Sequence, residues 1–142
     1  MMDYAEIISK IYLFSMLKKR DIKRIAKRAQ HHTYRKGEVI IREGERDGRV
    51  FVLIEGEVEV VIGLGTPKEK NIGRFGPESC FGEMAVLDDF VRTASIVVAR
   101  DTQALSLDQL NLRDEIFKNP SIAIELIQSL SRRLREVHEM MI

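Results

Sequence analysis

The spacing of glycines in the first half of the chain constrains the fold more than any other feature. Short β-branched runs between glycines are typical of an all-β barrel. The glycines in question are Gly37, Gly44, Gly48 and Gly56. The apolar run Val50–Ile54 predicts a buried strand, and the alternation that opens Glu57–Ile62 predicts a strand with one dry face. Residues 31–108 are therefore expected to form an all-β barrel.

Later segments fit the same barrel, and helical patterns flank it. Ala94–Ala99 and Ala104–Leu107 predict two further strands, and Gly63–Pro67 predicts a turn. Residues 1–30 and 109–142 carry apolar side chains at helical spacing. We therefore interpret residues 1–142 as one mainly β domain with N-terminal helices and a C-terminal helix.

The C-terminal helix has a recognisable start and a regular apolar seam. Asn119-Pro120 predicts the first turn, with Asn119 as the cap. Apolar residues then recur at spacings of 4, 3, 4, 3 and 4, and this heptad seam comprises Ala123, Ile127, Leu130, Leu134, Val137 and Met141. The seam is shorter than the three to four heptads that would indicate a free-standing coiled coil. It is expected to face the barrel, a second copy, or each in a different state.

The composition excludes several classes of protein. A chain of 142 residues with 44% apolar and 32% charged residues fits one ordinary globular domain. Its longest apolar run has five residues, far short of a membrane span. Cys80 is the only cysteine, which excludes a disulfide framework and a thiolate metal cluster. We expect a cytoplasmic protein that does not enter a membrane.

Charge is unevenly distributed along the chain. Residues 17–36 contain nine Lys or Arg residues and one acid, whereas residues 38–89 contain twelve acids and six Lys or Arg residues. The basic residues of the second helix form two rows four residues apart, Lys19, Lys23 and Lys27 beside Arg20, Arg24 and Arg28. One basic helix without interleaved aromatic residues is a weak footprint for nucleic acid. We interpret it as a solvated face and expect no nucleic-acid binding.

The sequence lacks the residues that a metal site or a nucleophilic catalyst requires. If His31 and His32 lie on a strand, they point to opposite faces and cannot share one ion. No Gly-x-Ser-x-Gly elbow is present, and no histidine lies near Cys80 in sequence to activate it. We therefore expect no enzyme activity, no metal and no cofactor.

One segment, residues 81–95, carries what a nucleoside monophosphate requires. Gly82 permits close approach of the backbone to a ligand. Glu83–Leu87 is expected to form one helical turn whose free N–H groups face an anion. Arg92, just before a strand, can meet phosphate oxygens bidentately, and Glu83 can accept from sugar hydroxyls. The alternative is a Glu83–Arg92 salt bridge that closes a surface loop.

This segment resembles the phosphate-binding cassette of the cyclic nucleotide-binding domain family, whose signature is Phe-Gly-Glu, a small residue two places on, and Arg-(Ala/Thr)-Ala after a short loop. The resemblance covers nearly the whole chain, and it implies an antiparallel β-roll (a jelly-roll or double-stranded β-helix) over residues 31–108. The further matching motifs are Phe14-Ser15-x-Leu17, Gly37-Glu38-x-Ile40-x-x-Glu43-Gly44, Phe51-x-Leu53-Ile54-x-Gly56-Glu57-Val58, and Asn119-Pro120 followed by Leu130-Ser131-x-x-Leu134. In one departure, Gly76-Pro77-Glu78 stands where the family usually has Pro-Gly-Asp.

The resemblance implies a role for each matching residue. Glu83 would accept from the ribose 2′-hydroxyl, assisted by the Gly82 backbone. Arg92 would pair with the cyclic phosphate, alongside the backbone N–H groups of Ala85 and Thr93. The residues implied as pocket lining are Phe81, Met84 and Ala94. Counting from Pro120, the residues implied as cover for the base are Arg133 and Val137.

We interpret the chain as a sensor that binds cAMP or cGMP and signals through its C-terminal helix to a second copy or to a separate effector protein. The residues do not distinguish the two nucleotides. We expect the output activity to lie outside this chain. The alternative is an interaction scaffold with a degenerate pocket, which docks a partner through the basic N-terminal helix.

Overall fold

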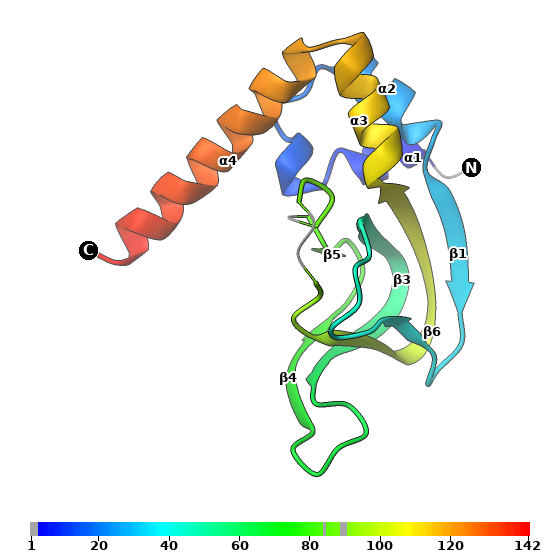
Figure 1. Cartoon of the computed structure of the whole chain (residues 1–142). Helices are drawn as coiled ribbons and strands as arrows, with labels where there is room; N and C mark the ends of the chain where they lie inside the picture. Colours follow the sequence, from blue (N-terminus) through cyan, green and yellow to red (C-terminus); the bar gives the residue numbers. More distant parts are fainter. Residues whose placement is uncertain (1–2, 84, 89–90) are drawn as a thin grey trace.

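The computed structural model describes residues 3–83, 85–88 and 91–142. Helical elements lie at both ends of this chain, and strands lie between them (Figure 1). The helical elements are α1 (Tyr4–Ile8), the 3-10 helix η1 (Tyr12–Phe14), α2 (Lys19–Ala26), α3 (Gln109–Lys118) and α4 (Ser121–Met140). The strands are β1 (Gln30–Tyr34), β2 (Val39–Ile41), β3 (Arg49–Ile62), β4 (Lys70–Phe75), β5 (Cys80–Phe81) and β6 (Ser95–Asp108).

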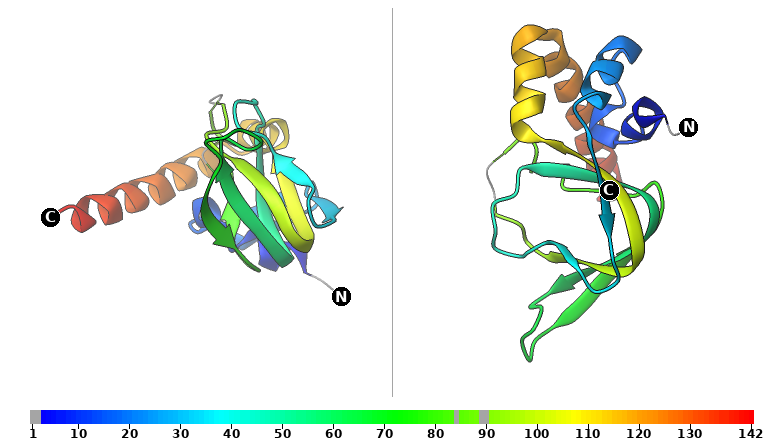
Figure 2. Two further views of the ribbon diagram at one scale, coloured as in Figure 1. Left: turned by 90° about the horizontal axis from the view of Figure 1, so that it is seen from below. Right: turned by 90° about the vertical axis from the view of Figure 1, so that its right-hand side faces the viewer.

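Two long strands, β3 and β6, form the centre of one antiparallel sheet. The strand order is β1-β6-β3-β4, while β2 pairs with β6 and β5 pairs with β3. The sheet curls into a roll with α1, α2 and α3 gathered at one end (Figures 1 and 2). The predicted antiparallel β-roll with flanking helices is therefore confirmed.

Each long strand joins segments that the sequence pattern separates. The register of β3 against β6 shifts around Gly56, which has φ +102°. A Cβ at Gly56 would lie 2.6 Å from the carbonyl oxygen of Asp101, so glycine is required where the two strands approach. The prediction of separate strands at Ala94–Ala99 and Ala104–Leu107 is wrong, because β6 is continuous. Residues 100–103 stay in the sheet through pairing with β1 and β3, which no local pattern reveals.

Side chains along β3 alternate between two cores. Val50 and Val52 join the core beneath the helices, whereas Phe51 and Leu53 join the core inside the roll. Arg49, two residues before Phe51, shares the face of the strand that points into the roll, and its guanidinium carbon lies 4.8 Å from the centre of the Phe51 ring. This alternation places a charged side chain beside the interior of the roll.

Two arginines of the basic row form ion pairs within the domain. Arg24 pairs with Asp21 and, at 3.2 Å, with Glu115 of α3. Arg28 pairs with Asp114 and, at 3.3 Å, with Glu115. Arg20 and Arg24 are exposed, as predicted for a solvated basic face, whereas Arg28 is half-buried against the acids of α3. The lysines of the neighbouring row are exposed.

Helix α4 begins against the domain and then leaves it. Ile122, Leu126 and Ser129 are buried, whereas every residue from 131 onward is exposed and the helix projects away from the roll (Figure 1). Part of the heptad seam is uncovered, since Leu134 is 71% exposed and Val137 is 45% exposed. Within the described ranges, no helix is both long enough and apolar enough to cross a membrane.

Asn119 positions the start of α4 in a way that the sequence does not predict. Its side chain accepts from the Ser121 hydroxyl at 2.7 Å and donates to Asp21 at 3.2 Å, while its backbone carbonyl accepts from the Ile122 N–H at 3.0 Å. The predicted side-chain cap on the helix N–H groups is therefore wrong. Asn119 instead ties the start of α4 to α2.

Candidate functional site

The cassette segment, residues 81–95, starts on a strand inside the roll. Strand β5 pairs with β3 so that Phe81 lies opposite Phe51. Their rings stack with centroids 5.2 Å apart and planes inclined by 17°. Phe81 is buried and belongs to the core of the roll. It offers the kind of apolar surface against which a small ligand packs.

Gly82 adopts a left-handed conformation with φ +85°. A Cβ at this position would lie 2.5 Å from Nη1 of Arg92 and 2.6 Å from the carbonyl oxygen of Arg49. Both the conformation and the lack of space exclude a side chain here. Because Gly82 has no side chain, the Arg92 guanidinium lies directly against the backbone. This is the place where the sequence predicts close approach of a ligand.

Arg92 is a buried cation with an incomplete set of partners. Its side chain is 9% exposed, and its guanidinium donates to the carbonyl oxygen of Arg49. Its Nη2 lies 3.7 Å from Oδ1 of Asp47, and its Nε is buried without a hydrogen-bond partner among the described residues. Burial lowers the pKa of Arg92, and the negative charge of Asp47 only partly offsets this effect. A buried guanidinium with an unused donor favours the binding of an anion.

Arg49 and Asp47 form a close pair beside Arg92. The Arg49 guanidinium donates to both carboxylate oxygens of Asp47, with Nε 2.9 Å from Oδ1 and Nη2 2.8 Å from Oδ2. Burial alone would raise the pKa of Asp47, but the hydrogen bond and charge of Arg49 outweigh it and hold that pKa below its ordinary value. Sequence reasoning missed this pair because it lies outside the cassette segment. The alternation that places Arg49 on the same face as Phe51 was the available signal.

Glu83 is directed toward the N-terminal helices. Its Oε2 accepts from the backbone N–H of Leu13 at 3.2 Å, and its Oε1 accepts from the Cys80 thiol at 2.9 Å. Burial, and then the hydrogen bond to Glu83, raise the pKa of Cys80 to about 12. Because Glu83 and Arg92 have separate partners, the alternative of a loop-closing salt bridge between these two described residues does not hold.

The remaining cassette residues lie along the loop between β5 and β6. Ala85 and Ala94 are half-buried, and Thr93 is exposed. Met84 falls outside the described residues. The described part of Glu83–Leu87 lies in turns, and because this segment contains Met84, the helical turn stays a prediction. The backbone of Arg92 anchors the end of the loop to the turn after β2 through the Glu45 carbonyl oxygen and the Gly44 N–H, both at 2.8 Å.

The residues predicted to cover a base lie on the projecting part of α4. The guanidinium carbon of Arg133 lies 3.9 Å from the centre of the Tyr12 ring, so this side chain already has a partner on η1. Arg133 is close enough to the cassette for its charge to act on the Cys80 thiol. Val137 lies one turn further along the helix and is 45% exposed. A role for either residue over a base stays a prediction.

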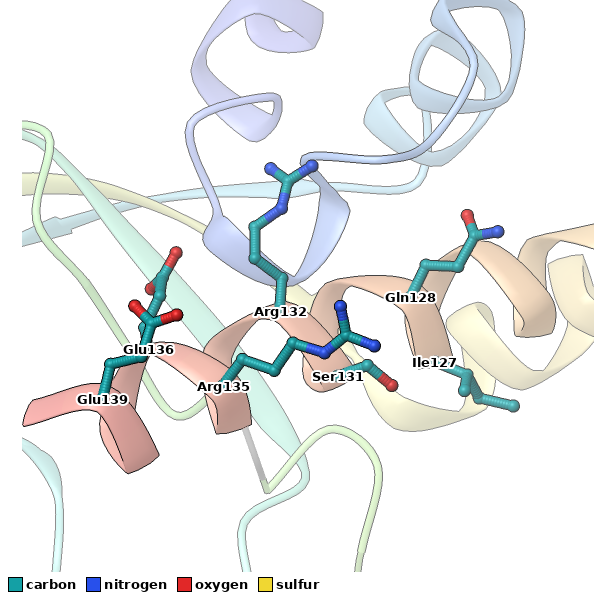
Figure 3. Close-up of a pocket in the computed structure, with 7 residues that line it drawn as sticks. All are labelled: Ile127, Gln128, Ser131, Arg132, Arg135, Glu136 and Glu139. Atoms are coloured by element: carbon teal, nitrogen blue, oxygen red, sulfur yellow. The ribbon is translucent and has the colours of Figure 1, made fainter. Parts of the chain in front are cut away.

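A groove of about 540 Å³ lies on α4, away from the cassette segment. Figure 3 shows that all the side chains lining it come from this one helix, and that Arg132 points toward η1. The lining residues are Ile127, Gln128, Ser131, Arg132, Arg135, Glu136 and Glu139. Arg132 donates to the sulfur of Met16 at 3.0 Å. The groove is an open, charged face of the helix and contains none of the predicted nucleotide-binding residues.

The approach to the cassette contains an unusual backbone conformation. Glu78 has φ +70°, the left-handed region that favours glycine. It follows Pro77 in a turn that the N–H of Ser79 closes onto the carbonyl oxygen of Gly76 at 3.2 Å. Such a turn favours proline followed by glycine at its centre. The departure noted in the sequence therefore places glutamate where the backbone favours glycine.

Comparison with known proteins identifies the family. The family model described as "Cyclic nucleotide-binding domain" matches residues 31–119. The CRP-like cAMP-activated global transcriptional regulator of Mycobacterium tuberculosis is 29% identical over 133 residues, covering 94% of this chain and 59% of that protein. The cGMP-dependent protein kinase of Toxoplasma gondii is 33% identical over 117 residues, covering 82% of this chain and 11% of the kinase. This chain therefore spans only part of the length of these relatives.

A solved structure gives the same result for the fold. The N-terminal domain of a transcriptional regulator from Streptomyces coelicolor superimposes with a TM-score of 0.84 at 24% identity, covering 96% of this chain and 95% of that one. The fold is thus shared over almost the full length of both chains. The family match extends over more than half of this chain and includes all the cassette residues. This chain belongs to the cyclic nucleotide-binding domain family.

Proposed function

We propose that this chain is a non-catalytic sensor domain that binds a cyclic nucleotide at the cassette segment. The observation that carries the proposal is Arg92 at the Gly82 turn: its side chain is 9% exposed, and its Nε has no hydrogen-bond partner among the described residues. A cyclic phosphate carries one negative charge and presents oxygens that suit this donor. Glu83 would accept from the ribose, and Phe81 with Ala94 would line the pocket. Relatives named for cAMP and for cGMP support this class of ligand.

The binding signal would pass from the cassette to α4 through η1. Glu83 accepts from the N–H of Leu13 on one side of η1. On the other side, the Tyr12 hydroxyl donates to Glu136 at 3.2 Å and the Tyr12 ring lies beneath Arg133. A ligand that engages Glu83 would change the attachment of η1 and so bias the position of α4. Such a bias requires the ligand to bind one arrangement more tightly than the other.

We further propose that the heptad seam of α4 contacts a second copy of the chain. The seam residues Leu134 and Met141 are 71% and 80% exposed. About two and a half heptads are too few to hold two helices together alone, so the contact would depend on the rest of the domain and on the state of the pocket. The cytoplasmic location stays a prediction from the sequence.

The alternative function, a scaffold that docks a partner through the basic helix, has less support. Arg24 and Arg28 already pair with the acids of α3. A degenerate pocket would also have no need for a buried Arg92 beside Gly82, and this chain has both residues. We therefore keep nucleotide binding as the proposed function.

A thermal-shift experiment tests the proposed function. The chain is heated alone and with cAMP, cGMP, 5′-AMP or 5′-GMP. A ligand present at a hundred times its dissociation constant stabilises the fold by about 2.7 kcal/mol, which raises the melting temperature by about 5–10 °C for a domain of this size. We expect one or both cyclic nucleotides to produce such a shift and the linear ones to produce less. No shift with either cyclic nucleotide at millimolar concentration would contradict the proposal.

A further inference from the structure

Two arginines, not one, meet at the cassette. Arg92 comes from the end of the cassette segment, and Arg49 comes from the start of β3. The guanidinium of Arg92 donates to the backbone carbonyl of Arg49, and the charge of Arg49 acts directly on Arg92. Arg49 also lies over the Phe51 ring, which stacks on Phe81 of the cassette. Arg49 is thus held against the same apolar wall that the proposed ligand would contact.

One carboxylate lies within ion-pair distance of both guanidiniums. Asp47 accepts two hydrogen bonds from Arg49 at 2.8 and 2.9 Å, and its Oδ1 lies 3.7 Å from Nη2 of Arg92. The contact with Arg92 exceeds a hydrogen bond in length, and Nε of Arg92 has no partner among the described residues. The negative charge of Asp88 also acts on Arg92. Asp47 therefore forms good hydrogen bonds with Arg49 but leaves the hydrogen-bonding capacity of Arg92 incompletely used.

We propose that Arg49 is a second phosphate-binding arginine of this site, and that Asp47 occupies the phosphate position until a ligand displaces it. This inference rests on the proposed function. A phosphate diester, like a carboxylate, has one negative charge and two free oxygens, but its larger group can accept from both guanidinium forks at once. The phosphate takes over the hydrogen bonds of Arg49 and completes those of Arg92. Asp47 then turns toward solvent, to which it is already partly exposed.

Substitutions of Arg49 and Asp47 are expected to change the affinity for a cyclic nucleotide in opposite directions. A purely structural role of the two residues would not produce this difference. Loss of the Arg49 guanidinium removes a ligand contact, so Arg49→Met is expected to weaken cyclic nucleotide binding at least about tenfold. Methionine keeps an unbranched apolar stem against Phe51. Asp47→Asn removes the competing charge and is expected to tighten binding by about tenfold. Its side-chain oxygen can still accept from the backbone N–H of Arg49, as Asp47 does at 3.2 Å.

The test is calorimetric titration of the full chain with cAMP and cGMP. The variants are Arg49→Met, Arg49→Lys, Asp47→Asn, Arg92→Ala and, as a matched control, Arg74→Met. Arg74 pairs with Glu57 and Glu59 on the outer hairpin, so its replacement removes an ion-paired arginine of the same sheet without touching the cassette. Thermal unfolding verifies that each variant is folded, and Arg49→Lys keeps the charge if the methionine variant does not fold. Arg49→Lys is expected to weaken binding less than Arg49→Met does.

The outcomes distinguish the inference from the proposed function. Weaker binding by Arg49→Met, with tighter binding by Asp47→Asn and no change in Arg74→Met, supports the inference. Unchanged affinity in Arg49→Met, or weaker binding by Asp47→Asn, overturns it while the loss in Arg92→Ala leaves the proposed function intact. Absence of binding by the unaltered chain overturns both.

Discussion

The carboxylate of Glu83 accepts a hydrogen bond from the backbone N–H of Leu13, 70 residues earlier in the chain, at 3.2 Å. This bond joins the cassette to η1, which in turn contacts α4 through Tyr12. The residue expected to hold a ribose is therefore also a residue that holds the helices in place. We therefore expect ligand binding at this site to change the position of α4 without any additional element.

The Cys80 thiol provides a readout of the Glu83 environment. Burial and the hydrogen bond to Glu83 raise its pKa from an ordinary 9.0 to about 12, which leaves far less thiolate at neutral pH than an unperturbed cysteine would have. We expect iodoacetamide to alkylate the native chain far more slowly than the urea-unfolded chain. Glu83→Gln removes one cause of the raised pKa and should accelerate alkylation of the folded protein.

The same raised pKa has a consequence for stability. The unfolded thiol loses its proton near its ordinary pKa, whereas the folded thiol keeps it. The contribution of Cys80 to the free energy of unfolding is therefore fully present below pH 9 and decreases as the pH rises toward 12. Cys80→Ala should remove this part of the alkaline decrease. Equal alkylation of the native and unfolded chains would show that the thiol is not held as described.

Glu78 is a position where a substitution should stabilise the fold. Its left-handed backbone costs a non-glycine residue about 1–2 kcal/mol, and glycine recovers about half of this because its greater chain entropy offsets the rest. We expect Glu78→Gly to raise the free energy of unfolding by about 0.5–1 kcal/mol. The exposed Lys10–Glu78 ion pair at 3.5 Å, which this change removes, contributes little.

The matched control for this prediction is Glu78→Ala, which removes the same ion pair but keeps a Cβ. Urea denaturation should place the alanine variant close to the unaltered chain. If the glycine variant were no more stable than the alanine variant, the turn would not be strained at residue 78.

A charge introduced into the exposed seam of α4 should disrupt the proposed contact between two copies of the chain. Leu134 is 71% exposed, so Leu134→Asp should change the free energy of unfolding by less than about 0.5 kcal/mol. Sedimentation velocity should nevertheless show that it shifts the chain from dimer to monomer. Leu110→Asp is the control, since Leu110 is 75% exposed on α3 and lies outside the seam. A monomer for the unaltered chain, with and without nucleotide, would exclude the seam as a contact between two copies.

Local features of the sequence account for the parts of the structure that were predicted. Gly82 and the order of helices and strands are visible as glycine spacing and apolar periodicity. The parts that were missed depend on partners far away in the sequence. Arg92 meets Asp47 and Arg49 more than forty residues earlier. The alternation along β3 places Arg49 on the same face as Phe51, but no local pattern joins it to Arg92. The same holds for Asn119, whose side chain bonds to Asp21 instead of capping α4.

The central claim is that Arg92 holds the phosphate of a cyclic nucleotide, and the most direct test is calorimetric titration of Arg92→Ala with cAMP and cGMP. A hydrogen-bonded contact to a charged group contributes about 1.5–3 kcal/mol, and leaving the phosphate unpaired adds to the loss, at about 1.4 kcal/mol for each tenfold change in affinity. We expect the variant to remain folded and to bind about a hundredfold more weakly than the unaltered chain. A folded Arg92→Ala variant that binds with unaltered affinity would contradict the assignment of this site.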